Sequence, residues 1–392
     1  MPLKLGPISQ QMDNMVQGIA DLAPAQGRFV EQAQALLRSV DADALREKLE
    51  VQRLQQWRIP WLVATPRSSL AGTVPAPAPP PNFCVIGSDA SSIPPDRHSS
   101  VRYYVVNVGY ALLNYGTHPD ATLDSHSQLG FQDEDLYVFP EKRDVPVEGV
   151  LLSARMEVES LRILHKVAQT TTGPTLALRD GPLILWTLQN ENEAVQQALL
   201  RDFLAAMSAL KQMGVPLGGY ISYSDGRDVA NSLRVWLCQG RPNACERCES
   251  DERDLCLALA KIHDRELFAF LGAGERSELF SSSSQILNRY GEHEVDFFYL
   301  NVGGEIARIE APRWVGADEE LLGFLHAATY DQCRRSPSFP PYPPALLEAH
   351  EQAAITPAER RLVEEMVERA LAQRGQRIVR SAKDDSKRRR GI

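Results

Sequence analysis

Aspartates stand at the ends of apolar segments in this chain, and that pattern limits what it can fold into. The apolar run 83–86 leads through Gly87-Ser88 to Asp89, and Asp180 lies within the apolar run 176–186. A carboxylate that a buried strand takes into the protein interior is costly unless a cation lies beside it. We therefore expect an α/β fold whose strands bring acidic side chains together at a cation site.

Each aspartate also has an ordinary structural interpretation. Asp89 can end its own loop as a turn residue, and Asp180-Gly181 is a common turn dipeptide. A hairpin at Asp180-Gly181 would leave two very short and wholly apolar strands, which favours a continuous strand over 175–186. His350, on a helix, is by itself more often a packed or surface histidine than a ligand.

Composition narrows the class of protein. The chain has 392 residues, of which 43% are hydrophobic, enough for one large core and an appendage. Its net charge of −9 excludes a basic coat but allows a local phosphate-binding groove. No apolar stretch approaches the roughly 20 residues that span a bilayer, and the N-terminus lacks a secretion signal. With six cysteines, four of them clustered, a cytoplasmic protein is expected.

The chain is expected to have four parts. Residues 1–70 form a helical segment, and the Pro- and Ala-rich stretch 71–81 forms an extended linker. Residues 82–373 alternate strands with helices, and 374–392 form a disordered basic tail. Within the helical segment, an apolar stripe from Met12 to Ile19 predicts a packing face or a self-association face.

The pattern predicts the individual elements of the main domain. The expected helices are 150–168, 191–213, 229–237, 346–354 and 357–373, the last with Thr356 as N-cap and Pro357 in its first turn. The expected strands are 101–113, 175–186, 219–223 and a short pair around Gly303-Gly304.

A third carboxylate is expected from the helix 150–168. Glu159 interrupts an apolar stripe that includes Met156 and Ile163, so it should point inward. Glu157, on a neighbouring face, is the alternative, and Arg155 could pair with Glu159 at the surface instead. Carboxylates in such a group suit Mg²⁺ or Mn²⁺, and two such ions can clamp the attacking and leaving oxygens of a phosphodiester.

A cysteine cluster lies within 238–256. Cys238, Cys245, Cys248 and Cys256 have the spacing C-x₆-C-x₂-C-x₇-C, which could hold structural Zn²⁺ or an iron–sulfur cluster. A surface loop of reduced cysteines is the alternative.

Four motifs in order resemble the NurA nuclease family, whose domain has an RNase H-like fold. The first three are Ser88-Asp89-Ala90-Ser91, the helix glutamate within 155–159, and Asp180-Gly181-Pro182-Leu183. The fourth is Tyr342-Pro343-Pro344 followed by His350. Ala90 stands where the family's first motif usually has glycine. The resemblance implies an RNase H-like mixed central sheet flanked by helices, here with an N-terminal helical extension.

The resemblance also implies function. Asp89, Glu159, Asp180 and His350 would hold Mn²⁺ or Mg²⁺, and Tyr342 would act near the scissile phosphate. An imidazole ligand favours manganese. Family enzymes cut single-stranded DNA and degrade ends 5′ to 3′ in end resection and repair, as dimers docked on a hexameric HerA-type ATPase. The alternatives are a catalytically weak DNA-binding or adaptor subunit of such an ATPase complex, and an enzyme acting on RNA or hybrids.

Overall fold

The computed structural model describes residues 4–54, 59, 61–96, 101–239, 242, 245 and 248–376. They divide into two compact units. The first unit comprises Met1–Pro75, Ser222–Ser284 and Asp296–Arg308, and the second comprises Ala76–Ile221, Gln285–Val295 and Ile309–Ile392. The domain boundaries expected from composition stay a prediction, and the basic tail lies outside the described residues from 377 onward. No helix in the described part of the chain has the length and apolarity to cross a membrane.

The second unit is built on a mixed sheet with the strand order β9-β8-β3-β4-β5. These strands are β3 (Phe83–Ile93), β4 (Tyr104–Tyr115), β5 (Asp120–Gly130), β8 (Thr175–Asp180) and β9 (Leu217–Ile221). β8 runs parallel to β3 and β9, whereas β4 runs antiparallel to both β3 and β5. The expected mixed α/β class is therefore confirmed. Strand β5 had no counterpart among the sequence predictions, because its side chains are polar and exposed on both faces.

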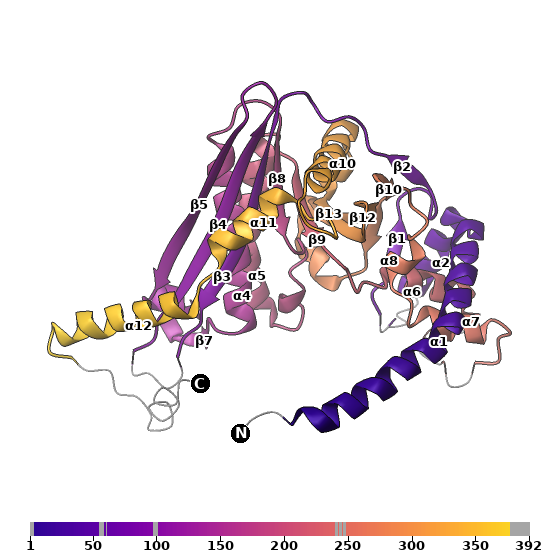
Figure 1. The fold of residues 1–392 in the computed structure, drawn as a ribbon, viewed down its shortest axis with the longest axis horizontal. Coiled ribbons are helices and arrows are strands. Elements are labelled where there is room, and N and C mark those ends of the chain that lie inside the picture. Colours follow the sequence, from indigo (N-terminus) through magenta and orange to yellow (C-terminus); the bar gives the residue numbers. More distant parts are fainter. Residues whose placement is uncertain are drawn as a thin grey trace. The chain divides into compact units, whose positions relative to one another are not determined.

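Helices cover both faces of this sheet. α4 (Val150–Ala168) and α5 (Glu193–Gln212) pack together, with α4 against β3 and β4. α11 (Pro344–Ala353) lies across β3 and β4 (Figure 1). Successive strand residues face opposite sides, so Ser88 bonds Ser160 of α4 (Oγ to Oγ, 2.7 Å), whereas Gly87 faces α11.

Two glycines let α11 approach the sheet closely. A Cβ atom at Gly87 would collide with the carbonyl oxygen of Ala345, and one at Gly109 would collide with the backbone of Ala349 and Ala353. Asn107 fastens the end of the helix, because its side-chain amide donates to the carbonyl oxygen of Ala353 at 2.9 Å. The sequence thus has glycine at the two strand positions that the backbone of α11 approaches most closely.

The expectation of a continuous strand over 175–186 is wrong. β8 ends at Asp180, and Gly181 adopts a φ of +100°, a conformation that favours glycine. The apolar residues Leu183, Ile184 and Leu185 continue as a buried loop. Their backbone N–H groups donate hydrogen bonds to side chains instead of to a neighbouring strand: those of Leu183 and Ile184 to Glu310, and that of Leu185 to the hydroxyl of Tyr290.

The remaining elements of the second unit surround this core. The helices are α3 (Asp133–Leu136), α9 (Arg313–Gly316), α10 (Glu319–Arg334) and α12 (Pro357–Ala372), and the small strands are β6 (Tyr137–Phe139) and β7 (Asp144–Pro146). Short 3₁₀ helices cover Pro140–Lys142, Trp186–Leu188, Gln285–Arg289 and Gly291–His293. Thr356 caps α12 in a capping box with Glu359, which confirms the predicted helix start.

The first unit joins the N-terminal helices to later parts of the chain. Its helices are α1 (Leu5–Ser39), α2 (Ala42–Leu54), α6 (Asp228–Leu237), α7 (Arg253–Leu259) and α8 (Asp264–Leu267). Its strands are β1 (Ala64–Pro66), β2 (Thr73–Pro75), β10 (Glu275–Ser277) and β11 (Phe280–Ser282). The predicted strand pair around Gly303-Gly304 is present as β12 (Val295–Asn301) and β13 (Ile306–Pro312), within which the chain passes between the units.

The two halves of α1 differ in the burial of their apolar side chains. In the second half, Ala33 and Leu37 are buried in the core of the first unit, together with residues of α2 and α6. In the first half, Met12 and Ile19 of the predicted stripe are exposed. The first half of the helix therefore presents an uncovered apolar face in the single chain.

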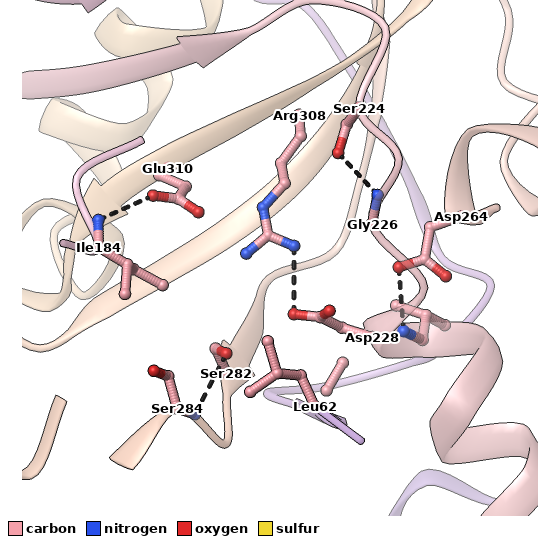
Figure 2. Close-up of polar contacts among 12 residues, drawn as sticks. Leu62, Ile184, Ser224, Gly226, Asp228, Asp264, Ser282, Ser284, Arg308 and Glu310 are labelled. Atoms are coloured by element: carbon pink, nitrogen blue, oxygen red, sulfur yellow. Dashed lines mark hydrogen bonds and ion pairs between the residues drawn. The ribbon is translucent and has the colours of Figure 1, made fainter. Parts of the chain in front are cut away.

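A buried aspartate closes the N-terminus of α6. Asp264 accepts hydrogen bonds from the backbone N–H groups of Val229 at 3.0 Å and Ala230 at 2.9 Å, and from the hydroxyl of Tyr299 at 2.7 Å. Asp228, at the start of the helix, pairs with Arg308 at 3.2 Å (Figure 2). These contacts supply the partners that the first N–H groups of a helix lack.

We expect Asp264→Ala to lower the free energy of unfolding by about 3 kcal/mol, because three donors would lose their acceptor in a buried site. Urea unfolding followed by circular dichroism measures the change. Asp264→Asn keeps one acceptor oxygen and should cost less. Asp225→Ala, whose side chain is 81% exposed, is the matched control and should change little. An alanine at 264 as stable as the wild type would show that the cap is dispensable.

Candidate metal centre

The two aspartates predicted from the sequence meet at neighbouring strands. In the parallel pair of β3 and β8, Ser88 lies opposite Arg179, so the next residues, Asp89 and Asp180, lie side by side. Both carboxylates are partly buried. The apolar strand segments 83–86 and 175–178 are buried and precede both aspartates. β8 ends at Asp180, whereas β3 continues past Asp89 to Ile93.

Helix α11 adds a histidine to the pair. Nδ1 of His350 lies 2.8 Å from Oδ2 of Asp89, and this hydrogen bond raises the pKa of His350. A ligand histidine commonly donates one ring N–H to a carboxylate, which orients the other nitrogen toward a metal. The close packing of α11 at Gly87 and Gly109 is what brings the imidazole to this position.

Tyr342 completes the constellation. Its hydroxyl donates a hydrogen bond to the carboxylate of Asp180. Its ring packs edge-on against that of Tyr220, with the centroids 5.1 Å apart. Tyr342 therefore lies beside the acids, where the resemblance placed it.

The three potential ligands are close enough for a common ion. One ligand atom each from Asp89, Asp180 and His350 lies within 4.8 Å of the others, and the described residues contain no other such group. Burial raises the pKa of Asp180, and the neighbouring Asp89 raises it further, against the hydrogen bond from Tyr342. A divalent cation would offset the repulsion between two partly buried carboxylates that lie this close together. Two oxygens and one imidazole nitrogen fit Mn²⁺ or Mg²⁺.

The helix glutamates do not join this group. Glu159 bonds Arg162 (Oε1 to Nη1, 2.6 Å), and Glu157 forms an ion pair with Arg179. The physical reason is the alternation of β3: α4 covers the face of Ser88, whereas Asp89 faces α11. Their role as metal ligands stays a prediction.

Two charged residues beside the site were missed by the sequence interpretation. Oε2 of Glu310, on β13, accepts hydrogen bonds from the backbone N–H groups of Leu183 at 2.8 Å and Ile184 at 3.2 Å (Figure 2). Arg179 donates to the carbonyl oxygen of Pro182, and burial lowers its pKa to about 10. Together they hold the loop that follows Asp180. Glu310 lies between Ile309 and Ala311 in β13, and an acid between apolar residues of a strand is the signal that Asp180 also gave.

Tyr220, Tyr223 and Arg227 are aromatic and basic residues of the kind that bind single-stranded DNA. The Tyr220 ring is fully buried. Tyr223 is exposed, with the guanidinium of Arg265 4.0 Å from its ring centroid. A buried ring cannot stack on a base.

The cysteine cluster lies in the first unit. Cys238, Cys245, Cys248 and Cys256 are partly buried and form no disulfide with one another, and all four line one pocket. They are treated separately below.

A mixed sheet that carries Asp89 on β3 and Asp180 at the end of β8, with His350 on the helix that covers them, defines an α/β protein with a candidate divalent-metal site. Comparison with protein families makes the assignment specific. The chain matches the NurA domain over residues 84–355, more than half of its length. The protein therefore belongs to the NurA family, nucleases that are associated with HerA and use divalent metals.

Other comparisons are more distant. No curated protein matches the chain. A solved structure titled LC9-RNase H1, a type 1 RNase H with the type 2 active-site motif, is similar at 10% identity. The match covers 41% of this chain and 71% of the other, with a TM-score of 0.22. A likeness at this level says nothing about activity.

Proposed function

We propose that this protein is a divalent-metal-dependent deoxyribonuclease that hydrolyses phosphodiester bonds by a two-metal mechanism. It would cut single strands and degrade ends 5′ to 3′ in DNA end resection and repair, together with a hexameric HerA-like ATPase. The observation that supports this most is the convergence of Asp89, Asp180 and His350 within 4.8 Å. Family membership supports the substrate class and the partner.

The residues present suit such chemistry. Asp89, Asp180 and His350 would hold Mn²⁺ or Mg²⁺, and a bound ion would lower the pKa of a water and neutralise charge on the phosphate. Asp89 orients the imidazole of His350 through Nδ1. Tyr342 orients Asp180 and lies where it could donate to a phosphate oxygen. Further oxygen ligands for a second ion would come from the substrate.

Two further parts of the proposal rest on the chain as a whole. The exposed stripe of α1, including Met12, Val16 and Ile19, supports a homodimer, because a second copy could cover it. Six free cysteines support a cytoplasmic location.

We expect DNA cleavage to require a divalent metal and to be faster with Mn²⁺ than with Mg²⁺, because one ligand is an imidazole. The assay uses single-stranded DNA labelled at the 5′ or the 3′ end, with Mn²⁺, Mg²⁺ or EDTA, and with or without a HerA-type ATPase. The labelled end that is released first reports polarity.

Controls separate the alternatives. A matched RNA strand and an RNA–DNA hybrid test substrate class, and cleavage restricted to them would replace the DNA assignment. Binding of DNA without cleavage under every metal condition, with the ATPase present, would make the protein an adaptor subunit.

A further inference from the structure

A second cluster of potential metal ligands lies in the first unit. Its ligands are thiols rather than carboxylates, and in the sequence they lie far from Asp89, Asp180 and His350. Its members are the four cysteines of the motif C-x₆-C-x₂-C-x₇-C. All of them line a pocket of about 530 Å³. The chain's two other cysteines, Cys84 and Cys333, are buried elsewhere.

Two of the cysteines are anchored by helices. Cys238 directly follows α6, and its backbone N–H donates to the carbonyl oxygen of Arg234 at 3.1 Å. The carbonyl oxygen of Cys238 accepts from Nζ of Lys48 at 2.8 Å. Cys256 lies in α7, and its N–H donates to the carbonyl oxygen of Glu252 at 2.9 Å. α6 and α7 pack against each other, which brings these two thiols to one pocket.

The other two cysteines lie on a turn. The N–H of Cys248 donates to the carbonyl oxygen of Cys245 at 3.3 Å, and Sγ of Cys245 lies 3.4 Å from the carbonyl oxygen of Pro242. Cys245 and Cys248 have the C-x₂-C spacing that structural zinc sites use.

A buried cation lies beside the pocket. Arg234 is 7% exposed, stacks on Trp61 with its guanidinium carbon 3.5 Å from a ring centroid, and hydrogen-bonds the Cys256 thiol. Its Nε atom is buried without a hydrogen-bond partner among the described residues. Four thiolates around Zn²⁺ carry a net charge of −2, and a buried arginine beside them offsets part of that charge.

We propose that Cys238, Cys245, Cys248 and Cys256 form a four-thiolate metal site that joins the end of α6 to α7. The bound metal is Zn²⁺ or the iron of an iron–sulfur cluster, since thiolates coordinate both well. No three of the four sulfur atoms, all in the described part of the chain, lie within 4.8 Å of one another. Binding therefore draws the turn onto the helices, as metal binding commonly couples to local folding. Zinc binding releases the thiol protons and involves no redox step.

The test uses the full chain, purified reduced and under anaerobic conditions. Elemental analysis should find zinc or iron, and a brown protein with visible absorption would identify an iron–sulfur cluster. In the metal-stripped protein, added Zn²⁺ should protect the four clustered cysteines from alkylation, whereas Cys84 and Cys333 are buried with or without the metal. Co²⁺ in place of Zn²⁺ should give the visible absorption of tetrahedral thiolate coordination.

Variants make the assignment specific. Cys245→Ser with Cys248→Ser should lose the metal, the protection and the Co²⁺ spectrum, and should unfold at a lower temperature. Cys333→Ala, which removes a thiol outside the group, should keep all of them. If the variant does not fold, the alkylation pattern of the wild-type chain still decides. Absence of bound metal together with alkylation of the four clustered thiols in the presence of Zn²⁺ would overturn the proposal, whatever the outcome of the nuclease assay.

Discussion

Asp89→Asn and Asp180→Asn are each expected to slow Mn²⁺-dependent DNA cleavage by about 10³-fold, because a bound metal contributes several kcal/mol to transition-state stabilisation. Each substitution replaces a charged oxygen with an amide and leaves the side-chain shape almost unchanged. The measurement is single-turnover cleavage of end-labelled single-stranded DNA at saturating enzyme. The proposed function predicts loss in both variants, because the two carboxylates act on a common ion.

A second readout separates lost chemistry from lost folding. The carboxylates of Asp89 and Asp180 repel each other in the metal-free protein, and burial disfavours the charged form of Asp180. Asp180→Asn should therefore melt at the same or a higher temperature in EDTA. Mn²⁺ should raise the melting temperature of the wild type but not of the variant, because ligand binding stabilises only the state that binds.

The matched control removes a carboxylate from the same sheet. Asp124 lies on β5, is exposed, and contacts the hydroxyl of Tyr110 at 3.4 Å. Asp124→Asn should keep both cleavage and the response of the melting temperature to Mn²⁺. Near-normal cleavage by Asp180→Asn would contradict the assignment of Asp89, Asp180 and His350 as the active centre.

Gly109→Ala is expected to lower the free energy of unfolding by about 3 kcal/mol and to reduce cleavage as well. The added Cβ would collide with the backbone of Ala349 and Ala353, and backbone atoms cannot move aside as a flexible side chain can. Helix α11 would have to shift or detach, and His350 directly follows Ala349 in that helix. Urea unfolding and the cleavage assay measure the two effects.

Gly323→Ala is the control for this substitution. Gly323 lies in α10, and a Cβ there would meet only Cγ of Pro77, at 3.9 Å. This alanine should be neutral or should stabilise the protein by up to about 1 kcal/mol, since glycine is a poor helix former. Equal stability of the two alanine variants would show that α11 does not need the close approach at Gly109.

Local patterns were enough to predict much of the fold. Helix α4 was predicted with the observed ends, since the segment has no proline or glycine. The start of α12 was readable from Thr356 as N-cap and Pro357 in the first turn. β5 was not predicted, because its polar side chains are exposed and the strand is held by its ladder with β4. Backbone pairing of this kind leaves no hydrophobic pattern in the sequence.

The candidate site was predicted in part. Asp89 and Asp180 were identifiable as acids at the ends of apolar runs, whereas Tyr342 and His350 depended on the resemblance to a family. Glu159 followed the helical period of α4, but that period shows only which side of the helix faces the sheet. It does not show which face of the sheet the helix covers.

Sequence alone determined that Asp89 and Asp180 follow buried apolar strand segments. Only the tertiary structure decided that α11, rather than α4, lies on the face of Asp89 and supplies the third ligand. It also decided that Glu310 holds the loop after Asp180 through two backbone N–H groups. The physical reason is that strand alternation and helix periodicity are local, whereas the choice of partner depends on how distant segments fill the space around the sheet.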